Sequence, residues 1–360
     1  MNNQIKYRAG TIPHSKPTLG AEEARAAAEV IASGHIAEGR VVDKFESAVA
    51  NFLGIEHAVS TGSGTAALHL SLLAMGVGPG DEVILPSYVC SALLNAVNYT
   101  GATPILAEIA SGTDNLDAAD VKKRLSKRTR AIIVPHLFGL AADLESIRAL
   151  DVPILEDCAQ AVGATYIGRL AGTIGQAAVF SFYATKVITT GEGGMVVCRS
   201  AKIADRIRNL KSYDRKENYK IRFNYKMTDI QAAMGLVQLG RLEDFIQRRR
   251  AIAETYHSAF SAYNLMLPPV GQGHIYYRYV LGLTCNSTPW IQSMSRLGIA
   301  CDRPIFLPLH RQLGLQGYPL TDEAWQNSLS IPIYPDLTDE EIDRVIDGIA
   351  TCAENLCSPP

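Results

Sequence analysis

Short apolar runs alternate with longer helical stretches through the middle of the chain, from about residue 57 to 200. The stretches at 65–76 and 141–150 are typical of helices that connect buried strands. Apolar strands separated by helices favour a parallel or mostly parallel sheet covered by helices on both faces. Such a sheet binds its ligands at the carboxyl ends of its strands. We predict strands at 82–86, 103–107, 131–136, 152–157, 177–182 and 194–199.

The second half of the chain has a different pattern. Apolar positions recur at helical spacing from Thr228 to Ala262, which predicts one long helical region. Prolines and glycines at 268–273 end it, and a strand at 276–283 follows. Helices are expected near 288–297 and over 338–350. We therefore predict an α/β protein with an N-terminal arm and helix (1–45), a large domain (46–240) and a smaller C-terminal α/β domain (241–360).

Composition narrows the class of protein. The 360 residues are 47% hydrophobic and 19% charged, with a net charge of −2, so nothing overall favours nucleic acid or an anionic membrane as a partner. The seven cysteines contain no C-x-x-C pair, which favours reduced thiols over a disulfide framework or a metal site. The chain starts without an apolar signal core and contains no apolar run of membrane-spanning length. We expect a soluble cytoplasmic protein.

One lysine lies in an unusual setting. In SFYATKVITTGEGGMVV (181–197), Ser181 ends one predicted strand, Lys186 follows, and three glycines lead into the next strand. A lysine in a glycine-rich connection is usually a solvated surface residue. In a pyridoxal-phosphate (PLP) enzyme, however, one lysine amine must attack the cofactor's aldehyde, and the same residue can then act as a base.

A carboxylate precedes this lysine at the end of another strand. Asp157 closes the apolar run 152–157 and is expected at the carboxyl edge of the sheet. A carboxylate there can pair with a protonated pyridine nitrogen and keep the ring an electron sink. An N-cap for the next helix is the alternative role.

A third motif suits a phosphate group. The GSGT turn, with Gly64 and Thr65, opens the helix predicted at 65–76, whose free N–H groups and positive dipole end attract anions. Helix capping would explain the turn about as well. Ser181 offers a hydroxyl to the same phosphate. Tyr88, in the PSYV turn after strand 82–86, is a candidate for stacking on the pyridine ring, or else a core tyrosine.

Taken in order, the motifs resemble those of the DegT/DnrJ/EryC1/StrS aminotransferases, which act on nucleotide-linked keto-sugars. The resemblance covers nearly the whole chain. It implies an aspartate-aminotransferase-type fold (fold type I), PLP as cofactor, and a homodimer with its active sites at the subunit interface. The motifs are FESAVANFLG, GSGTAALHLSLLAMGVGPGDEVILPSY, NYTGATPI, EDCAQAVGA, SFYATKVITTGEGGMVV, NYKMTDIQAAMGLVQL, PLH and LSIPIYPDLTDEEIDRVI.

By position, Lys186 resembles the family's Schiff-base lysine and Asp157 the partner of the pyridine nitrogen. Gln160 resembles a polar residue beside the cofactor ring, although a capping or surface role would also suit it. The remaining cofactor contacts implied by the resemblance are Gly64, Thr65, Tyr88 and Ser181.

Two further positions are implied outside this group. Asn224 resembles an asparagine that reaches the phosphate of the other subunit's cofactor, although it could instead cap a helix. His310 resembles a position near the sugar end of the pocket, although a core or surface histidine is equally consistent. The chain departs from the family pattern at Cys90, where a hydroxyl or aromatic residue is usual, and at Glu108, where Asp is usual.

The sequence therefore predicts a PLP-dependent transaminase. The resemblance implies that an amino acid, most often glutamate, donates the amine and that a nucleotide-linked keto-hexose accepts it. A related sugar dehydratase branch carries histidine in place of the lysine, so Lys186 disfavours that reaction. The same motifs are compatible with a ring-aromatising relative or a non-catalytic PLP-binding regulatory protein. The alternating strands and helices by themselves would also suit an unrelated nucleotide-binding α/β protein.

Overall fold

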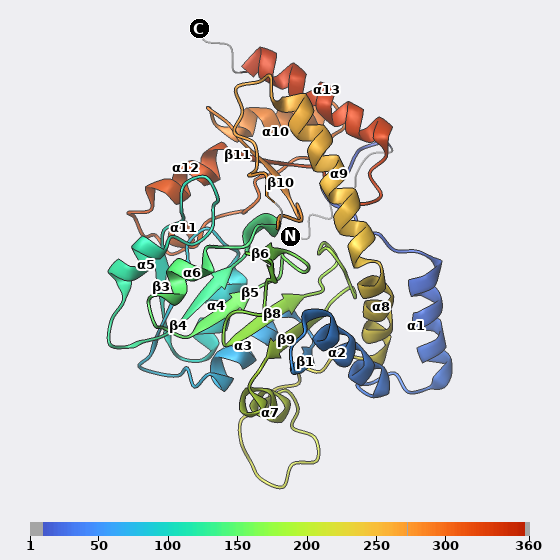
Figure 1. Cartoon of the computed structure of the whole chain (residues 1–360), viewed down its shortest axis with the longest axis vertical. Helices are drawn as coiled ribbons and strands as arrows, with labels where there is room; N and C mark the ends of the chain where they lie inside the picture. The colour runs from blue at the N-terminus through green and yellow to red at the C-terminus, as the bar shows by residue number, and fades with distance from the viewer. Residues whose placement is uncertain (1–9, 272, 357–360) are drawn as a thin grey trace.

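A seven-stranded sheet forms the centre of the molecule in the computed structural model, which describes residues 10–271 and 273–356 (Figure 1). The first nine residues of the predicted arm and Cys357 lie outside the described residues. The strand order is β1-β9-β8-β5-β4-β2-β3, and only β9 runs antiparallel to its neighbours. The mostly parallel sheet predicted from the apolar runs is confirmed. The strands are β1 (His57–Thr61), β2 (Glu82–Pro86), β3 (Thr103–Ala107), β4 (Thr129–Pro135), β5 (Ile154–Asp157), β8 (Ala177–Ser181) and β9 (Gly194–Cys198).

Pairing of the parallel strands brings several carboxyl ends to one edge. Pro135 of β4 pairs with Asp157 of β5, and Asp157 pairs with Val179 of β8. Ser181 therefore ends β8 close to where Asp157 ends β5. This edge is where a parallel sheet binds ligands.

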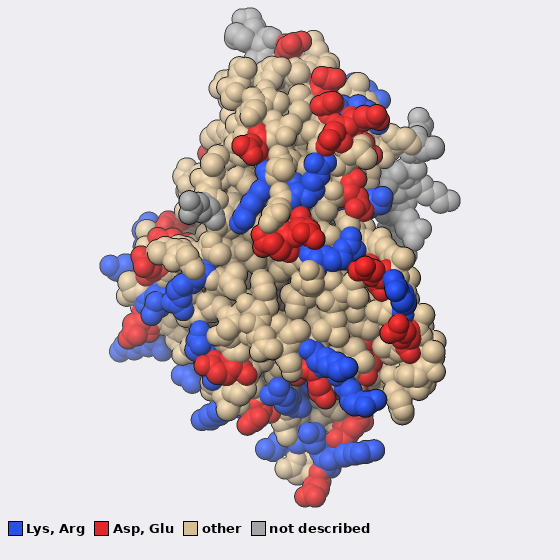
Figure 2. Space-filling view, turned by 45° about the vertical axis from the view of Figure 1, so that its right-hand side comes forward, with Lys and Arg blue, Asp and Glu red and all other residues tan. Residues whose placement is uncertain are grey.

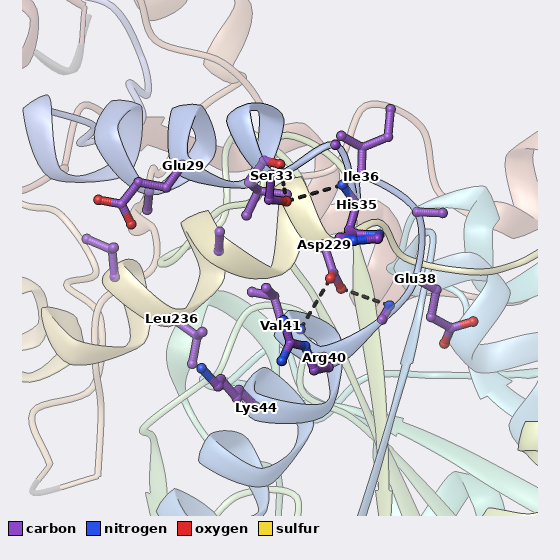
Figure 3. Close-up of a pocket in the computed structure, with 17 residues that line it drawn as sticks. Glu29, Ser33, His35, Ile36, Glu38, Arg40, Val41, Lys44, Asp229 and Leu236 are labelled. Atoms are coloured by element: carbon purple, nitrogen blue, oxygen red, sulfur yellow. Dashed lines mark hydrogen bonds between the residues drawn. The ribbon is translucent and has the colours of Figure 1, made fainter.

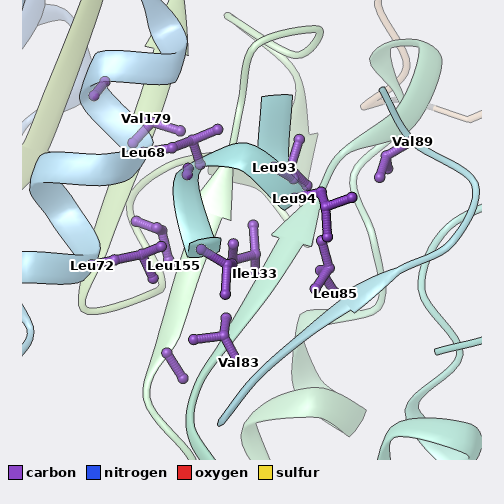
Figure 4. Packing of buried hydrophobic residues seen from close by; sticks show 14 of the residues in the cluster. Leu68, Leu72, Val83, Leu85, Val89, Leu93, Leu94, Ile133, Leu155 and Val179 are labelled. Atoms are coloured by element: carbon purple, nitrogen blue, oxygen red, sulfur yellow. The ribbon is translucent and has the colours of Figure 1, made fainter. Parts of the chain in front are cut away.

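Apolar side chains fill the space between the sheet and its helices. Figure 4 shows Leu68 and Leu72 of α3 packed with residues of β2, β4, β5 and β8, among them Leu155 and Val179. Eight of the eleven residues of α3 are buried, so this helix is apolar on every side rather than amphipathic. The helices around the sheet are α3 (Gly64–Ala74), α4 (Ser91–Tyr99), α5 (Ala118–Arg124), α6 (Leu144–Arg148) and α7 (Ala201–Leu210), with a short 3-10 turn at Leu137–Gly139 and a small hairpin of β6 (Thr165–Tyr166) and β7 (Arg169–Leu170).

The N-terminal segment does not divide at residue 45. Helix α1 (Ala21–Ser33) packs on α8 (Asp229–Gly240), and α2 (Arg40–Leu53) continues past that position. Phe45 of α2 is fully buried and its ring lies 5.2 Å from the ring of Phe182. The boundary predicted at 45 thus falls inside α2, because the apolar face of that helix belongs to the core of the large sheet.

The long helical region predicted at 228–262 consists of two helices. Helix α8 ends at Gly240 and α9 (Leu242–Phe260) begins after Arg241. Helix α9 leads into the C-terminal region, where β10 and β11 pair antiparallel (Figure 1). The predicted boundary at 240 falls between these two helices. The remaining elements are β10 (Tyr279–Gly282), α10 (Ser287–Arg296), α11 (Leu309–Gln312), α12 (Pro319–Asn327), β11 (Ser328–Ile331) and α13 (Asp339–Leu356).

The described helices include none that is both long and apolar enough to cross a membrane. On the face drawn in Figure 2, acidic and basic side chains are interspersed. This mixture agrees with the near-neutral net charge of −2.

Candidate active site

Asp157 is a buried carboxylate at the carboxyl end of β5. Its side chain accepts one hydrogen bond, from the Ala159 N–H at 2.9 Å, and forms no ion pair with a described residue. Burial raises its pKa, while the Ala159 N–H and the positive charges of Lys186 and His136 offset part of that rise. A buried carboxylate in this state would be stabilised by a cation brought by a ligand.

A pair of buried residues lies next to Asp157. His136 Nε2 contacts Glu156 Oε2 at 3.0 Å, and the amides of Gly172, Ile174 and Gly175 donate to the same carboxylate. Burial alone would raise the pKa of Glu156, but the hydrogen bonds from His136 and the amides hold it below its usual range. These groups satisfy one another, so Glu156 needs no ligand while its neighbour Asp157 lacks a cation.

Gly64, Thr65 and Ser181 form a small polar cradle at the start of α3. The helix begins at Gly64, and Ser63 caps the Ala66 N–H at 3.1 Å. The amides of Gly64 and Thr65 meet no acceptor among the described residues. A Cβ at position 64 would lie 2.8 Å from Ser181 Cβ and 3.2 Å from its Oγ. The two free amides and the Ser181 hydroxyl thus line a space that suits an anion.

Lys186 lies in the connection that follows β8. Its amine forms no ion pair with a described residue and lies 5.3 Å from the centre of the Tyr277 ring. Its charge acts on Asp157, so the lysine and the carboxylate belong to one site. Gln160 approaches the same edge: its Oε1 accepts the Phe138 N–H at 2.8 Å, which leaves its NH₂ group free to donate.

Tyr88 does not reach this site, contrary to the stacking role expected for it. Its side chain is fully buried in the apolar cluster, its ring packs against Phe138, and its hydroxyl points to the Ala324 carbonyl. From the same turn, Cys90 is exposed, and the charges of Asp157 and Lys186 act on its thiol. The turn was correctly expected near the site, but Cys90 is the side chain that faces it.

His310 is also occupied elsewhere. Its Nδ1 lies 2.7 Å from Ser87 Oγ, its Nε2 lies 3.0 Å from Asp322 Oδ1, and its ring stacks on Tyr318. Only 1% of the residue is exposed. Both ring nitrogens therefore serve to join the C-terminal region to the Ser87 turn, and neither remains for a sugar substrate.

Asn224 is exposed and remote from Lys186 in sequence. The next residue, Tyr225, accepts the Gly62 N–H at 2.8 Å, so the segment carrying Asn224 touches the turn that leads to Gly64 in its own chain. The amide side chain of Asn224 forms no hydrogen bond with a described residue. Asn224 is therefore free to contact either a ligand or another chain.

Tyr277 is a site residue that the sequence did not single out. It lies in the aromatic run YYRYVLGL, which predicts a strand and gives no sign of the chemistry. Only the fold brings it, from just before β10, to the amine of Lys186.

The largest groove of the described residues, about 850 Å³, lies elsewhere. It runs between α1, α2 and α8 and contains none of the predicted site residues (Figure 3). Its one buried carboxylate, Asp229, accepts the amides of Gly39, Val41 and Val42 and so caps α2. We take the sheet edge as the candidate active site, because the free amides, the unpaired carboxylate and the lysine meet there.

Comparison with known proteins agrees with this choice. The sequence model of the DegT/DnrJ/EryC1/StrS aminotransferase family matches residues 17–350. A GDP-perosamine synthase of Caulobacter vibrioides is 37% identical over 333 residues, which cover 86% of this chain and 90% of that relative. The crystal structure of the aminotransferase TlmJ from Streptoalloteichus hindustanus is similar with a TM-score of 0.91 and 33% identity, covering 96% of this chain and all of that one. The PLP form of the putative sugar aminotransferase Spr1654 from Streptococcus pneumoniae has a TM-score of 0.91 and 26% identity, covering 97% of this chain and all of that one. The same protein is also similar in its PMP form.

Proposed function

The chain belongs to the DegT/DnrJ/EryC1/StrS aminotransferase family, and from this premise we propose that it transfers an amino group from an amino acid to a nucleotide-linked keto-sugar. Its cofactor is pyridoxal phosphate. The observation that carries the proposal is the unpaired buried carboxylate of Asp157 beside the amine of Lys186. The name of the Caulobacter relative, GDP-perosamine synthase, supports a nucleotide-linked sugar as acceptor.

The residues at the sheet edge fit this cofactor. We assign the phosphate to the amides of Gly64 and Thr65 and to the Ser181 hydroxyl, because a side chain at position 64 would fill that cradle. We assign Asp157 to the ring nitrogen, because its carboxylate lacks a cation. Gln160 has a free NH₂ group to donate to the ring's substituents.

Bound pyridoxal phosphate supplies an aldehyde that joins an amine and a ring that draws electrons from the amino carbon. In our proposal Lys186 holds the cofactor until a substrate amine displaces it. The freed amine of Lys186 then takes the proton from the amino carbon and returns it to the cofactor's C4′ carbon. Asp157 keeps the ring nitrogen protonated, and the intact lysine disfavours the dehydratase reaction.

The reaction can be tested with purified protein, glutamate and a panel of nucleotide-linked keto-sugars, with the products identified by mass. We expect one sugar to gain an amine and glutamate to become its keto acid. A protein that converts glutamate but none of the sugars would contradict the acceptor and keep the aminotransferase assignment. Failure with glutamate and success with another amino acid would correct the donor alone.

The phosphate cradle gives a separate prediction. Gly64→Ala should weaken binding of pyridoxal phosphate about tenfold or more, because the new methyl group lies 2.8 Å from Ser181 Cβ and one of the two must move. Gly78→Ala is the matched control, since a Cβ there meets no atom within 4 Å. Equilibrium dialysis of the cofactor-free proteins measures both affinities. Equal affinity for the two variants would remove the cradle from the site.

We further propose a homodimer whose active sites are shared. The support is the segment that carries Asn224: it is exposed, and it leads directly into α8, which lines the groove of Figure 3. The Asp229 N–H at the start of α8 donates to the Ala37 carbonyl of the groove's rim. We propose that a second copy of the chain covers this continuous surface and receives Asn224 at its cofactor phosphate. A two-fold axis would repeat that contact in both directions.

Mixing two defective chains tests the sharing. Asn224→Ala should retain pyridoxal phosphate poorly, and Lys186→Ala should be inactive. In a mixed dimer, a shared arrangement gives one site with both defects and one with neither, so activity should reappear. Mixed dimers that form but stay inactive would mean that Asn224 serves its own chain, as the contact of Tyr225 with Gly62 would allow.

A further inference from the structure

Tyr277 presents its ring to two cations. The ring centre lies 5.3 Å from the amine of Lys186 and 5.1 Å from the guanidinium carbon of Arg278. The side chain is buried, with 6% exposed. The Thr185 side chain, next to the lysine in sequence, hydrogen-bonds the Tyr277 hydroxyl. A cation over a buried aromatic face is held more strongly than one at an exposed face.

The backbone around Tyr277 is fixed from two sides. Gly139 adopts a φ of +95°, and a Cβ there would lie 2.8 Å from the Tyr277 nitrogen, so only glycine permits this approach. The Ile275 and Arg278 amides donate to the carbonyls of Gly139 and Phe138. From α9, the buried Arg249 donates to the carbonyls of Tyr276 and Tyr277. The ring is thus held at the lysine independently of the lysine itself.

The charges facing Tyr277 are positive on every side that packs against it. They are Lys186 from the connection after β8, Arg278 from its own segment and Arg249 from α9. Burial alone would raise the pKa of Tyr277, but Lys186, Arg278, the Thr185 hydrogen bond and Arg249 lower it to about 8. The neighbouring Tyr276 differs, because burial raises its pKa. The phenol of Tyr277 is therefore linked to the charge of the lysine amine.

We propose that Tyr277 is a positioning residue for Lys186, whose ring holds the lysine amine toward the cofactor site and whose hydroxyl gains or loses its proton as that amine changes charge. The proposal rests on the role proposed for Lys186. When the amine is charged, the phenol releases its proton more readily; when the amine is bound or neutral, the phenol keeps it. A proton is thereby stored one side chain away from the group that must lose and regain one in each half-reaction.

The linkage can be measured in the cofactor-free protein. Since the chain has 15 tyrosines, the titration of Tyr277 is the tyrosinate absorbance of the wild type minus that of Tyr277→Phe. We expect a single transition near pH 8, where an ordinary tyrosine titrates near pH 10. In the Lys186→Met background the same difference should move to higher pH, because the amine's charge is gone. Tyr276→Phe is the matched control and should leave the transition near pH 8 in place.

The positioning role has its own readout. We expect Tyr277→Leu to capture added pyridoxal phosphate about tenfold more slowly than the wild type, followed by absorbance, because the ring that holds the amine is missing. Tyr277→Phe keeps the ring and should capture the cofactor at nearly the wild-type rate. If Tyr277→Leu does not fold, the titration of the Phe variant still decides the linkage.

A transition near pH 10, or one unchanged by Lys186→Met, would overturn the linkage. Capture by Tyr277→Leu at the wild-type rate would overturn the positioning. Neither measurement depends on transamination, so they separate this proposal from the proposed function. If the protein turned over no sugar, Tyr277 would still titrate near pH 8.

Discussion

Lys186→Ala should leave the protein folded and reduce transamination by about a thousandfold or more. The variant loses both the amine that holds the cofactor and the base that moves the proton, two contributions that each reach this order. The fold should survive because the Lys186 amine makes no ion pair with a described residue. Turnover and circular dichroism of the purified variant measure the two effects.

The same lysine can be identified chemically. Borohydride reduction of the wild type should fix pyridoxal phosphate on the peptide that contains Lys186, and no label should appear in Lys186→Ala. Lys202→Ala is a suitable control, since Lys202 is exposed on α7. Label on any other peptide would refute the assignment of Lys186, whatever the activity of the variants.

The apolar pattern predicts the sheet well because its strands are buried on both faces. Continuous apolar runs such as 82–86 and 103–107 match β2 and β3 residue for residue. The break between α8 and α9 was not predicted, because the apolar spacing continues through Arg241 without a proline. Helix α2 likewise crosses the predicted boundary at residue 45, because burial of Phe45 depends on contacts with Phe182, far along the chain.

The site was predictable where a residue ends a strand or opens a helix. Asp157, Ser181 and Gly64 are of this kind, since pairing of the strands determines where such positions lie. Within a turn, sequence identifies the turn that approaches the site but not the side chain that faces it. Tyr88 and Cys90 are two residues apart, and their roles were exchanged for this reason.

Residues that reach the site from the C-terminal region were the hardest to predict. Tyr277 lies 91 residues after Lys186 in an ordinary aromatic strand pattern, and only the packing of β10 against the 3-10 turn at Leu137–Gly139 brings it there. The Ser87 and Asp322 contacts of His310 depend on the same packing. Glu108, a departure from the family pattern, accepts the amides of Leu320 and Thr321 and so joins α12 to the sheet.

Asp157→Asn should separate activity from stability. Asparagine keeps the oxygen that accepts the Ala159 N–H but cannot pair with a protonated ring nitrogen. Losing an electrostatic contact of this kind costs on the order of 2.7–4 kcal/mol in the transition state, so turnover should fall about 100-fold or more. The free energy of unfolding of the cofactor-free protein should not fall. Burial raises the pKa of Asp157, so ionisation opposes folding at neutral pH, and that cost disappears in acid as the group is protonated in both states.

Glu156→Gln is the matched control for this prediction, one residue earlier on the same strand. Glu156 accepts three amides and the His136 ring, and the pKa of Glu156 lies below its usual range, so its ionised form supports the fold at neutral pH. That support is lost as the pH falls through the folded pKa. We therefore expect Glu156→Gln to lower the free energy of unfolding at neutral pH, whereas Asp157→Asn leaves it unchanged or raises it. Denaturant unfolding of both cofactor-free variants at neutral and acidic pH, beside their turnover, measures the contrast. Near-normal turnover of Asp157→Asn would reduce Asp157 to a helix cap, and destabilisation equal to that of Glu156→Gln would mean that its carboxylate serves the fold rather than the cofactor.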